Sequence, residues 1–150
     1  MNYKQIIGLS ARVVVGSVLI YSGGSKALGP TAEFAAAIAA YHIVPADWVS
    51  MIAAVWPWLE LLVGTYLFFG YFTRLTAMAS AALFAVFLTV LLSAIVRGID
   101  PGSCGCFGMG ISLGIHKMAV LDAILLILSI RSIIQSESPH SLSADHWIQR

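Results

Sequence analysis

The chain has 150 residues, of which 59% are hydrophobic and only 10% are charged, and its formal net charge is +1. Soluble domains carry about 25% charged residues, so this composition predicts an integral membrane protein. The small net charge and the lack of a clustered basic surface exclude a protein that binds nucleic acid through counterion release.

The first apolar stretch runs from Ile6 to Tyr21, and Lys4 precedes it. A secretory signal is the alternative interpretation of such a segment. Arg12 interrupts the apolar run and no A-x-A cleavage site follows, which favours a helix that is retained. We expect the first membrane span at about residues 6–24.

A longer connection, from Ser25 to Trp48, contains a run of small apolar residues at 34–40. Pro30 suits the first turn of a helix there, and Pro45 lies beyond its end. A helix rises about 1.5 Å per residue and needs about 20 residues to cross the hydrocarbon core. The run is too short for this, so it predicts an interfacial or re-entrant helix.

Three further apolar stretches are expected to span the membrane, at about residues 49–69, 75–96 and 116–134, the first two being long enough without tilt. Aromatic side chains near the ends of the second span are typical of anchors in the headgroup region, although a flat pocket for a quinone ring remains an alternative. These side chains belong to Trp48, Trp56, Trp58 and Tyr71. In the third span, Ala77, Ala81 and Ala85 predict a smooth face for a neighbouring helix.

The sequence therefore predicts an all-α fold, an integral membrane four-helix bundle with the short helix between spans one and two. This membrane domain covers residues 1–134. Residues 135–150 lose the apolar character and form a polar C-terminal tail.

The only two cysteines, Cys104 and Cys106, flank Gly105 in a glycine-rich loop that continues with Phe107 and Gly108. A disulfide across one intervening residue is strained, and strained or exposed disulfides are the labile, oxidising ones. A bridge that merely braces the loop is the main alternative, yet so small a ring removes little chain entropy. Thiols that stay reduced, or that bind a metal, are further alternatives, but two sulfurs fall short of the four ligands of structural zinc.

Charged residues fall within the spans, where an isolated charge costs at least about 2.5 kcal/mol. We expect Arg12 to pair with Glu60 inside the bundle, with Asp122 as a rival or third member. The pair either fixes helix register or, as the alternative, provides a carboxylate that carries protons for quinone or thiol chemistry. Lys26, at the end of the first span, is expected to extend to the interface, or else to stabilise a thiolate of the cysteine loop.

Three motifs together resemble a known family. They are Tyr21-Ser22-Gly23-Gly24-Ser25-Lys26 at the close of the first span, Trp58-Leu59-Glu60-Leu61-Leu62-Val63-Gly64 in the second, and Cys104-Gly105-Cys106-Phe107-Gly108 after the third. With these motifs the chain resembles the MauE branch of the DoxX-like membrane proteins over about residues 5–132. An arginine expected before Asp122 is replaced by Leu121.

The resemblance implies a four-helix inner-membrane protein associated with periplasmic disulfide chemistry, in a family named for maturing the disulfide-rich small subunit of methylamine dehydrogenase. It also implies a thioredoxin-like partner. No cofactor follows from the motifs, and quinone remains open.

The basic residues favour termini in the cytoplasm, by four (Lys4, Arg74, Arg131, Arg150) against three (Lys26, Arg97, Lys117). This orientation, in a bacterial inner membrane, places the cysteine loop in the periplasm, where disulfides persist. We therefore expect a thiol–disulfide redox component in which Cys104 and Cys106 exchange with a thioredoxin-like periplasmic protein. The alternative is a non-catalytic small subunit of a larger respiratory or photosynthetic membrane complex, with a structural cysteine loop.

Overall fold

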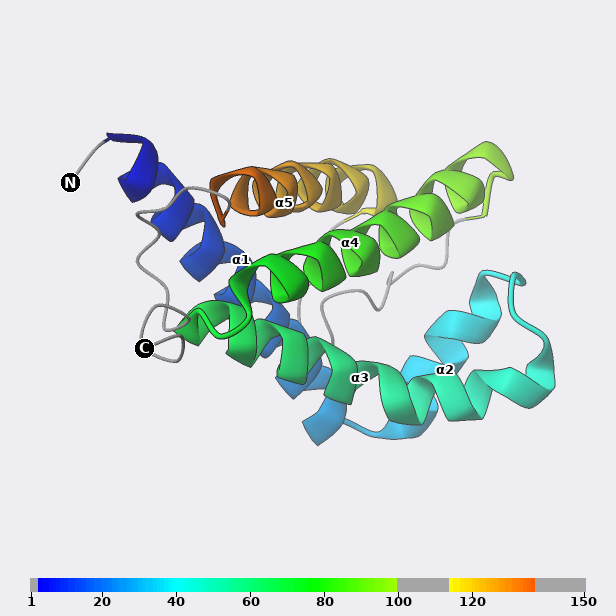
Figure 1. Ribbon diagram of the computed structural model, residues 1–150. Coiled ribbons are helices and arrows are strands. Elements are labelled where there is room, and N and C mark those ends of the chain that lie inside the picture. Colours follow the sequence, from blue (N-terminus) through cyan, green and yellow to red (C-terminus); the bar gives the residue numbers. More distant parts are fainter. Residues whose placement is uncertain (1–2, 100–113, 137–150) are drawn as a thin grey trace.

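Every element of the computed structural model is a helix, over the residues that it describes, 3–99 and 114–136 (Figure 1). The five helices are α1 (Tyr3–Leu28), α2 (Thr31–Ala40), α3 (Ala46–Phe69), α4 (Thr73–Val96) and α5 (Ile115–Ser136). The expected all-α fold is confirmed. The first helix continues four residues beyond the predicted end of its span, which brings Lys26 into α1.

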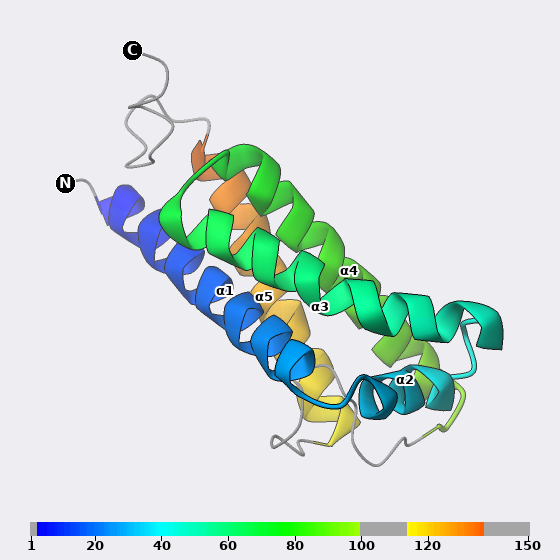
Figure 2. The ribbon, with the colours of Figure 1, turned by 90° about the horizontal axis from the view of Figure 1, so that it is seen from below.

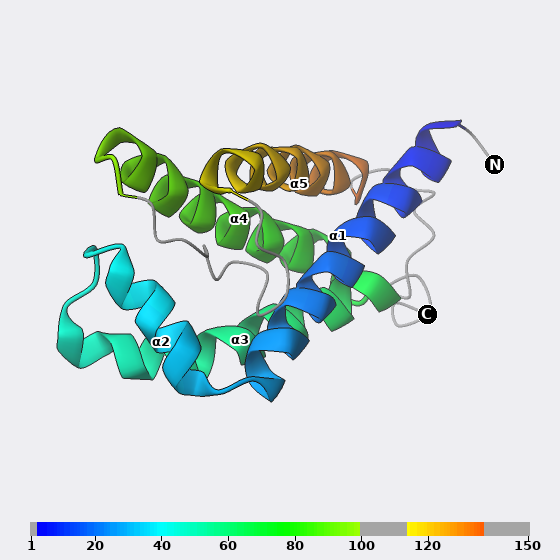
Figure 3. The same cartoon turned by 180° about the vertical axis from the view of Figure 1, so that it is seen from behind.

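The four long helices lie alongside one another and alternate in direction, whereas α2 crosses one end of the bundle (Figures 2 and 3). The start of α1, the turn between α3 and α4, and the end of α5 share one end of the bundle, called here the Arg12 end. The end of α1, helix α2, the end of α4 and the start of α5 share the other, the Lys26 end. Helix α1 packs most extensively on α3, and α4 on α5.

Three of these helices, α1, α3 and α4, are long and apolar enough to cross a membrane. The short apolar helix predicted between the first two spans is confirmed as α2, with Pro30 at its N-cap and Pro45 at the N-cap of α3. Helix α5 is not among these three, and it carries the charged residues Lys117, Asp122 and Arg131. A fourth span therefore stays a prediction.

Glycines allow the backbones of α1 and α3 to approach closely. A Cβ added to Gly16 would lie 3.0 Å from the carbonyl oxygen of Gly64, and one added to Gly23 would lie 2.7 Å from that of Pro57. Small residues permit such contacts between membrane helices. Of the alanines expected to form a packing face on α4, Ala77 is buried but Ala85 is exposed.

Helix α3 ends in a Schellman motif at Gly70, whose φ of 76° is in the left-handed region that glycine adopts without strain. The amide of Tyr71 donates to the carbonyl of Tyr66, and the amide of Gly70 donates to that of Leu67. These bonds satisfy carbonyls at the helix end, and the chain turns directly into α4.

We expect Gly23→Ala to destabilise the bundle, because its new methyl group would also lie 2.8 Å from the amide nitrogen of Leu61. Overpacking of this kind costs on the order of 1–3 kcal/mol. The matched control is Gly24→Ala, since the nearest atom to a Cβ there is the Leu61 Cδ2 at 3.9 Å. Both substitutions gain the same helix propensity. Thermal unfolding in detergent should show a lower midpoint for Gly23→Ala alone; equal midpoints would contradict the close contact.

Candidate functional site: a buried ion pair between α1 and α3

A lysine and a glutamate form an ion pair inside the bundle. The Nζ of Lys26 lies 2.8 Å from Oε1 and 3.0 Å from Oε2 of Glu60. The two side chains are 1% and 0% exposed. The pair joins the last turn of α1 to the middle of α3, at the Lys26 end.

Two neighbouring side chains complete the hydrogen bonding of this pair. The hydroxyl of Ser22 accepts a bond from Lys26 Nζ at 3.0 Å and donates one to Glu60 Oε2 at 3.1 Å. The indole N–H of Trp56 donates to Glu60 Oε1 at 3.2 Å. An ammonium has three donors, and all three are used here. The network needs no solvent to satisfy the ammonium.

Aromatic rings from two other helices cover the ammonium. Lys26 Nζ lies 5.1 Å from the ring centroid of Phe34 in α2 and 4.8 Å from that of Phe87 in α4. Both distances are within the range of cation–π attraction, which strengthens when water is excluded. Trp56 packs edge-on against Phe87, with ring centroids 5.5 Å apart. Four helices thus contribute to one polar cluster.

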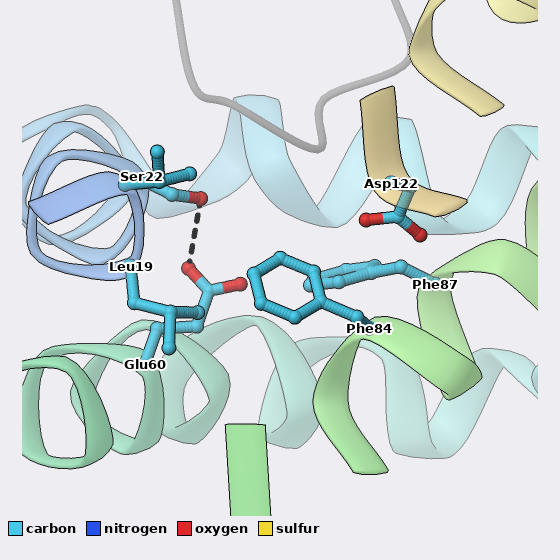
Figure 4. Close-up of a pocket in the computed structure, with 7 residues that line it drawn as sticks. Leu19, Ser22, Glu60, Phe84, Phe87 and Asp122 are labelled. Carbon is cyan, nitrogen blue, oxygen red and sulfur yellow. Dashed lines mark hydrogen bonds between the residues drawn. The ribbon is translucent and has the colours of Figure 1, made fainter. Parts of the chain in front are cut away.

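A small cavity lies beside the cluster, bounded by Ser22 and Glu60 on one side and by Asp122 on the other (Figure 4). Phe84 and Phe87 of α4 lie between the two carboxylates. The cavity measures about 10 Å³, which is near the lower limit for one water molecule. It has no room for a ring such as a quinone, so these residues provide no quinone pocket in this conformation.

The charged residues singled out in the sequence do not all meet. Glu60 pairs with Lys26 rather than with Arg12, and the expectation that Lys26 extends to the interface is wrong. Arg12 precedes Lys26 by fourteen residues on the same helix, about 21 Å along its axis. Its guanidinium lies against Gly70, where an added Cβ would be 2.8 Å from Nη1. Arg12 thus belongs to the opposite end of the bundle.

Asp122 is 2% exposed and borders the same cavity as Glu60, so the structure brings these two acidic residues to one region. Cys104, Gly105, Cys106, Phe107 and Gly108 lie outside the described residues.

The side chains that surround the ion pair were not predicted from the sequence. Ser22 and Lys26 are four residues apart on α1, and Trp56 and Glu60 are four apart on α3. Helical neighbours at this spacing share a face, so the spacing was a usable signal. No such pattern links Phe34 or Phe87 to the lysine, because these contacts depend on how α2 and α4 pack.

One family model, described as "Methylamine utilisation protein MauE", matches residues 4–135. The chain belongs to the MauE family. No match was found among the curated proteins or among the solved structures.

The MauE match extends over all five helices almost to the end of α5, and it includes both halves of the ion pair and both cysteines. It confirms the resemblance drawn from the three sequence motifs at the level of the MauE family; the wider relation to DoxX-like proteins stays a prediction. The molecule is therefore a MauE-family membrane protein, with at least three helices suited to spanning the bilayer.

We expect Glu60→Ala to lower the free energy of unfolding by on the order of 3–5 kcal/mol, because it leaves a buried ammonium without its carboxylate. The double variant Lys26→Met/Glu60→Met should recover most of this loss, since apolar residues of similar volume remove both charges. Lys117→Met, at an exposed lysine of α5, is the control. Unfolding in detergent measures all of these; a double variant as unstable as Glu60→Ala would contradict the pairing.

Proposed function

We propose that this MauE-family protein is a membrane-embedded thiol–disulfide redox component, in which Cys104 and Cys106 exchange electrons with a thioredoxin-like protein in the periplasm. The observation that carries this proposal is the sequence Cys104-Gly105-Cys106, which holds the only cysteines of the chain and connects α4 to α5 within the family match.

The exchange is a two-electron reaction between a dithiol and a disulfide. A thiolate of the reduced protein attacks a sulfur of the oxidised protein, forming a mixed disulfide and releasing one thiolate. The second thiol of the reduced protein then resolves the mixed disulfide. One protein gains two electrons and two protons as the other loses them, so the reaction needs no further reactant. The potentials of the two pairs set its direction.

The short spacing of Cys104 and Cys106 favours a redox role over a purely structural disulfide. Closing a ring across one residue stabilises a fold little, because the entropic contribution of a disulfide grows with the number of residues enclosed. The same short spacing strains the bond and makes it easier to reduce. Both effects support reversible oxidation.

The buried ion pair limits how the thiols could be activated. Lys26 donates to Glu60 and Ser22 and is covered by two aromatic rings, so its charge is already satisfied. It is therefore a poor candidate for stabilising a cysteine thiolate. We propose that activation comes from the cysteine loop itself or from the partner.

The surface of α5 supports its role as a fourth span. Its exposed large side chains from residue 120 to 134 include Val120, Ile124, Ile127, Ile130 and Ile134. Asp122, which lowers the mean hydropathy of the helix, is buried against the bundle. Lys117 and Arg131 are fourteen residues apart, about 21 Å along the axis, so each lies toward one end. Such a helix can contact lipid along its outer face.

Burial of Lys26 also strengthens the proposed orientation. A lysine neutralised inside the protein does not act as a loop charge, so the Lys26 end retains Arg97 and Lys117. The Arg12 end and the terminal segments retain four basic residues, Lys4, Arg74, Arg131 and Arg150. The positive-inside rule then favours cytoplasmic termini and a periplasmic cysteine loop, in a bacterial inner membrane.

Topology can be checked by labelling single cysteines in intact cells, on a Cys104→Ser/Cys106→Ser background. We expect Ala32→Cys to react with a membrane-impermeant maleimide, because α2 lies at the proposed periplasmic end. Tyr71→Cys, in the α3–α4 turn, and Ser136→Cys, at the last residue of α5, should react only after permeabilisation. Labelling of Ser136→Cys in intact cells would contradict the fourth span.

Trapping tests the reaction itself. A variant with one cysteine, Cys104→Ala or Cys106→Ala, lacks its resolving thiol, so we expect one of them to accumulate a mixed disulfide with a soluble thioredoxin-like protein. The Cys104→Ser/Cys106→Ser variant is the control. Because it cannot exchange electrons, we expect the redox state of that partner in cells to differ from its state beside the wild type. The proposal fails if neither variant captures a protein and the partner is unchanged. Stable co-purification with a larger complex, with the cysteines locked in one state, would support the non-catalytic subunit instead.

A further inference from the structure

We propose that Glu60 and its neighbours form a receptor for a primary ammonium group, which Lys26 fills in the native chain. A free short alkylammonium ion should bind there once the lysine side chain is shortened. This inference does not depend on the thiol chemistry, because every residue that it uses lies among the described helices.

The hydrogen-bond donors of the ammonium match the acceptors around it. The ammonium of Lys26 donates to Glu60 Oε1, Glu60 Oε2 and Ser22 Oγ, at 2.8, 3.0 and 3.0 Å. Three acceptors thus face three N–H groups, and a carboxylate supplies the opposite charge. A quaternary ammonium lacks these donors, and the planar guanidinium of arginine presents its donors in a flat fork. The site therefore selects a primary ammonium.

Two aromatic rings cover the ammonium. Phe34 and Phe87 lie 5.1 and 4.8 Å from the ammonium, measured to their ring centroids. Cation–π attraction to these rings favours any organic cation, so the preference for a primary ammonium comes from the three acceptors and not from the rings. The rings also exclude water, which strengthens the attraction between the ammonium and Glu60.

Most of the receptor belongs to helices other than the one that carries the lysine. Glu60 and Trp56 belong to α3, Phe34 to α2 and Phe87 to α4. Trp56 holds Glu60 Oε1 with its own hydrogen bond. Shortening Lys26 removes the ammonium without changing any of these side chains, and it vacates the volume that the lysine side chain fills.

The size of the free ligand follows from the substitution. Lys26→Ala keeps Cβ and removes three further carbons and the nitrogen, which n-propylammonium replaces atom for atom. We expect n-propylammonium chloride to raise the unfolding midpoint of Lys26→Ala in detergent by several degrees, with a shift that saturates as the concentration increases. Propan-1-ol and n-propyltrimethylammonium chloride, at the same concentrations, should give no such shift.

Two control proteins separate binding at this site from general effects of the amine. The wild type already contains its ammonium, so n-propylammonium should leave its midpoint unchanged. Lys26→Ala/Glu60→Gln lacks the negative charge and should lose the saturable shift. If Lys26→Ala does not fold unaided, the amine is supplied during expression and extraction, and the folded yield is measured against the same treatment with propan-1-ol.

The proposal is overturned if the amine, the alcohol and the quaternary ammonium act alike, or if the Glu60→Gln background responds as strongly as Lys26→Ala. Recovery by n-propylammonium alone, dependent on Glu60, establishes the receptor.

Discussion

Hydrocarbon cannot solvate a charge or a hydrogen-bonding group, and this constraint governs how the buried polar residues of the described helices are satisfied. Within the described helices, several serines and threonines donate to carbonyls of their own helix, as Thr89 does to Ala85 and Ser129 to Leu125, whereas Ser22 donates to Glu60. A lysine has no such local solution. Lys26 therefore requires a carboxylate, a hydroxyl and two aromatic rings, and these come from helices that must all be in place. The ion pair thus specifies how four helices meet.

Much of the fold could be predicted from the sequence, because long apolar runs and the two prolines at 30 and 45 are local signals. The partner of Glu60 could not be predicted from the sequence. Arg12 and Lys26 are both cations of α1, and choosing between them requires the length of that helix and its height relative to α3. The helix continues to Leu28 rather than ending near residue 24, and this extension carries Lys26 inward. The packing of the helices, and not the composition of the chain, determines that Glu60 pairs with Lys26 and not with Arg12.

The same limit applies to the candidate site as a whole. Glu60 and Asp122 were recognisable because acidic residues inside apolar segments are rare and costly. The contacts of Phe34 and Phe87 with the ammonium were not recognisable, since aromatic residues are common in membrane helices and their neighbours come from elsewhere in the chain. The match to the MauE family covers the cysteines as well, but it does not explain the ion pair, which lies in a different part of the sequence.

The four long helices pack as two pairs. Helices α1 and α3 are joined by glycine contacts along their backbones and by the Lys26–Glu60 salt bridge, so they form one unit. Helices α4 and α5 form a second unit, and residues 97–114 connect its two members directly. The two units meet where α1 packs on α5 and α3 packs on α4. Phe87 of α4 lies against both Lys26 and Trp56, so the ring that covers the ammonium also holds one helix pair to the other.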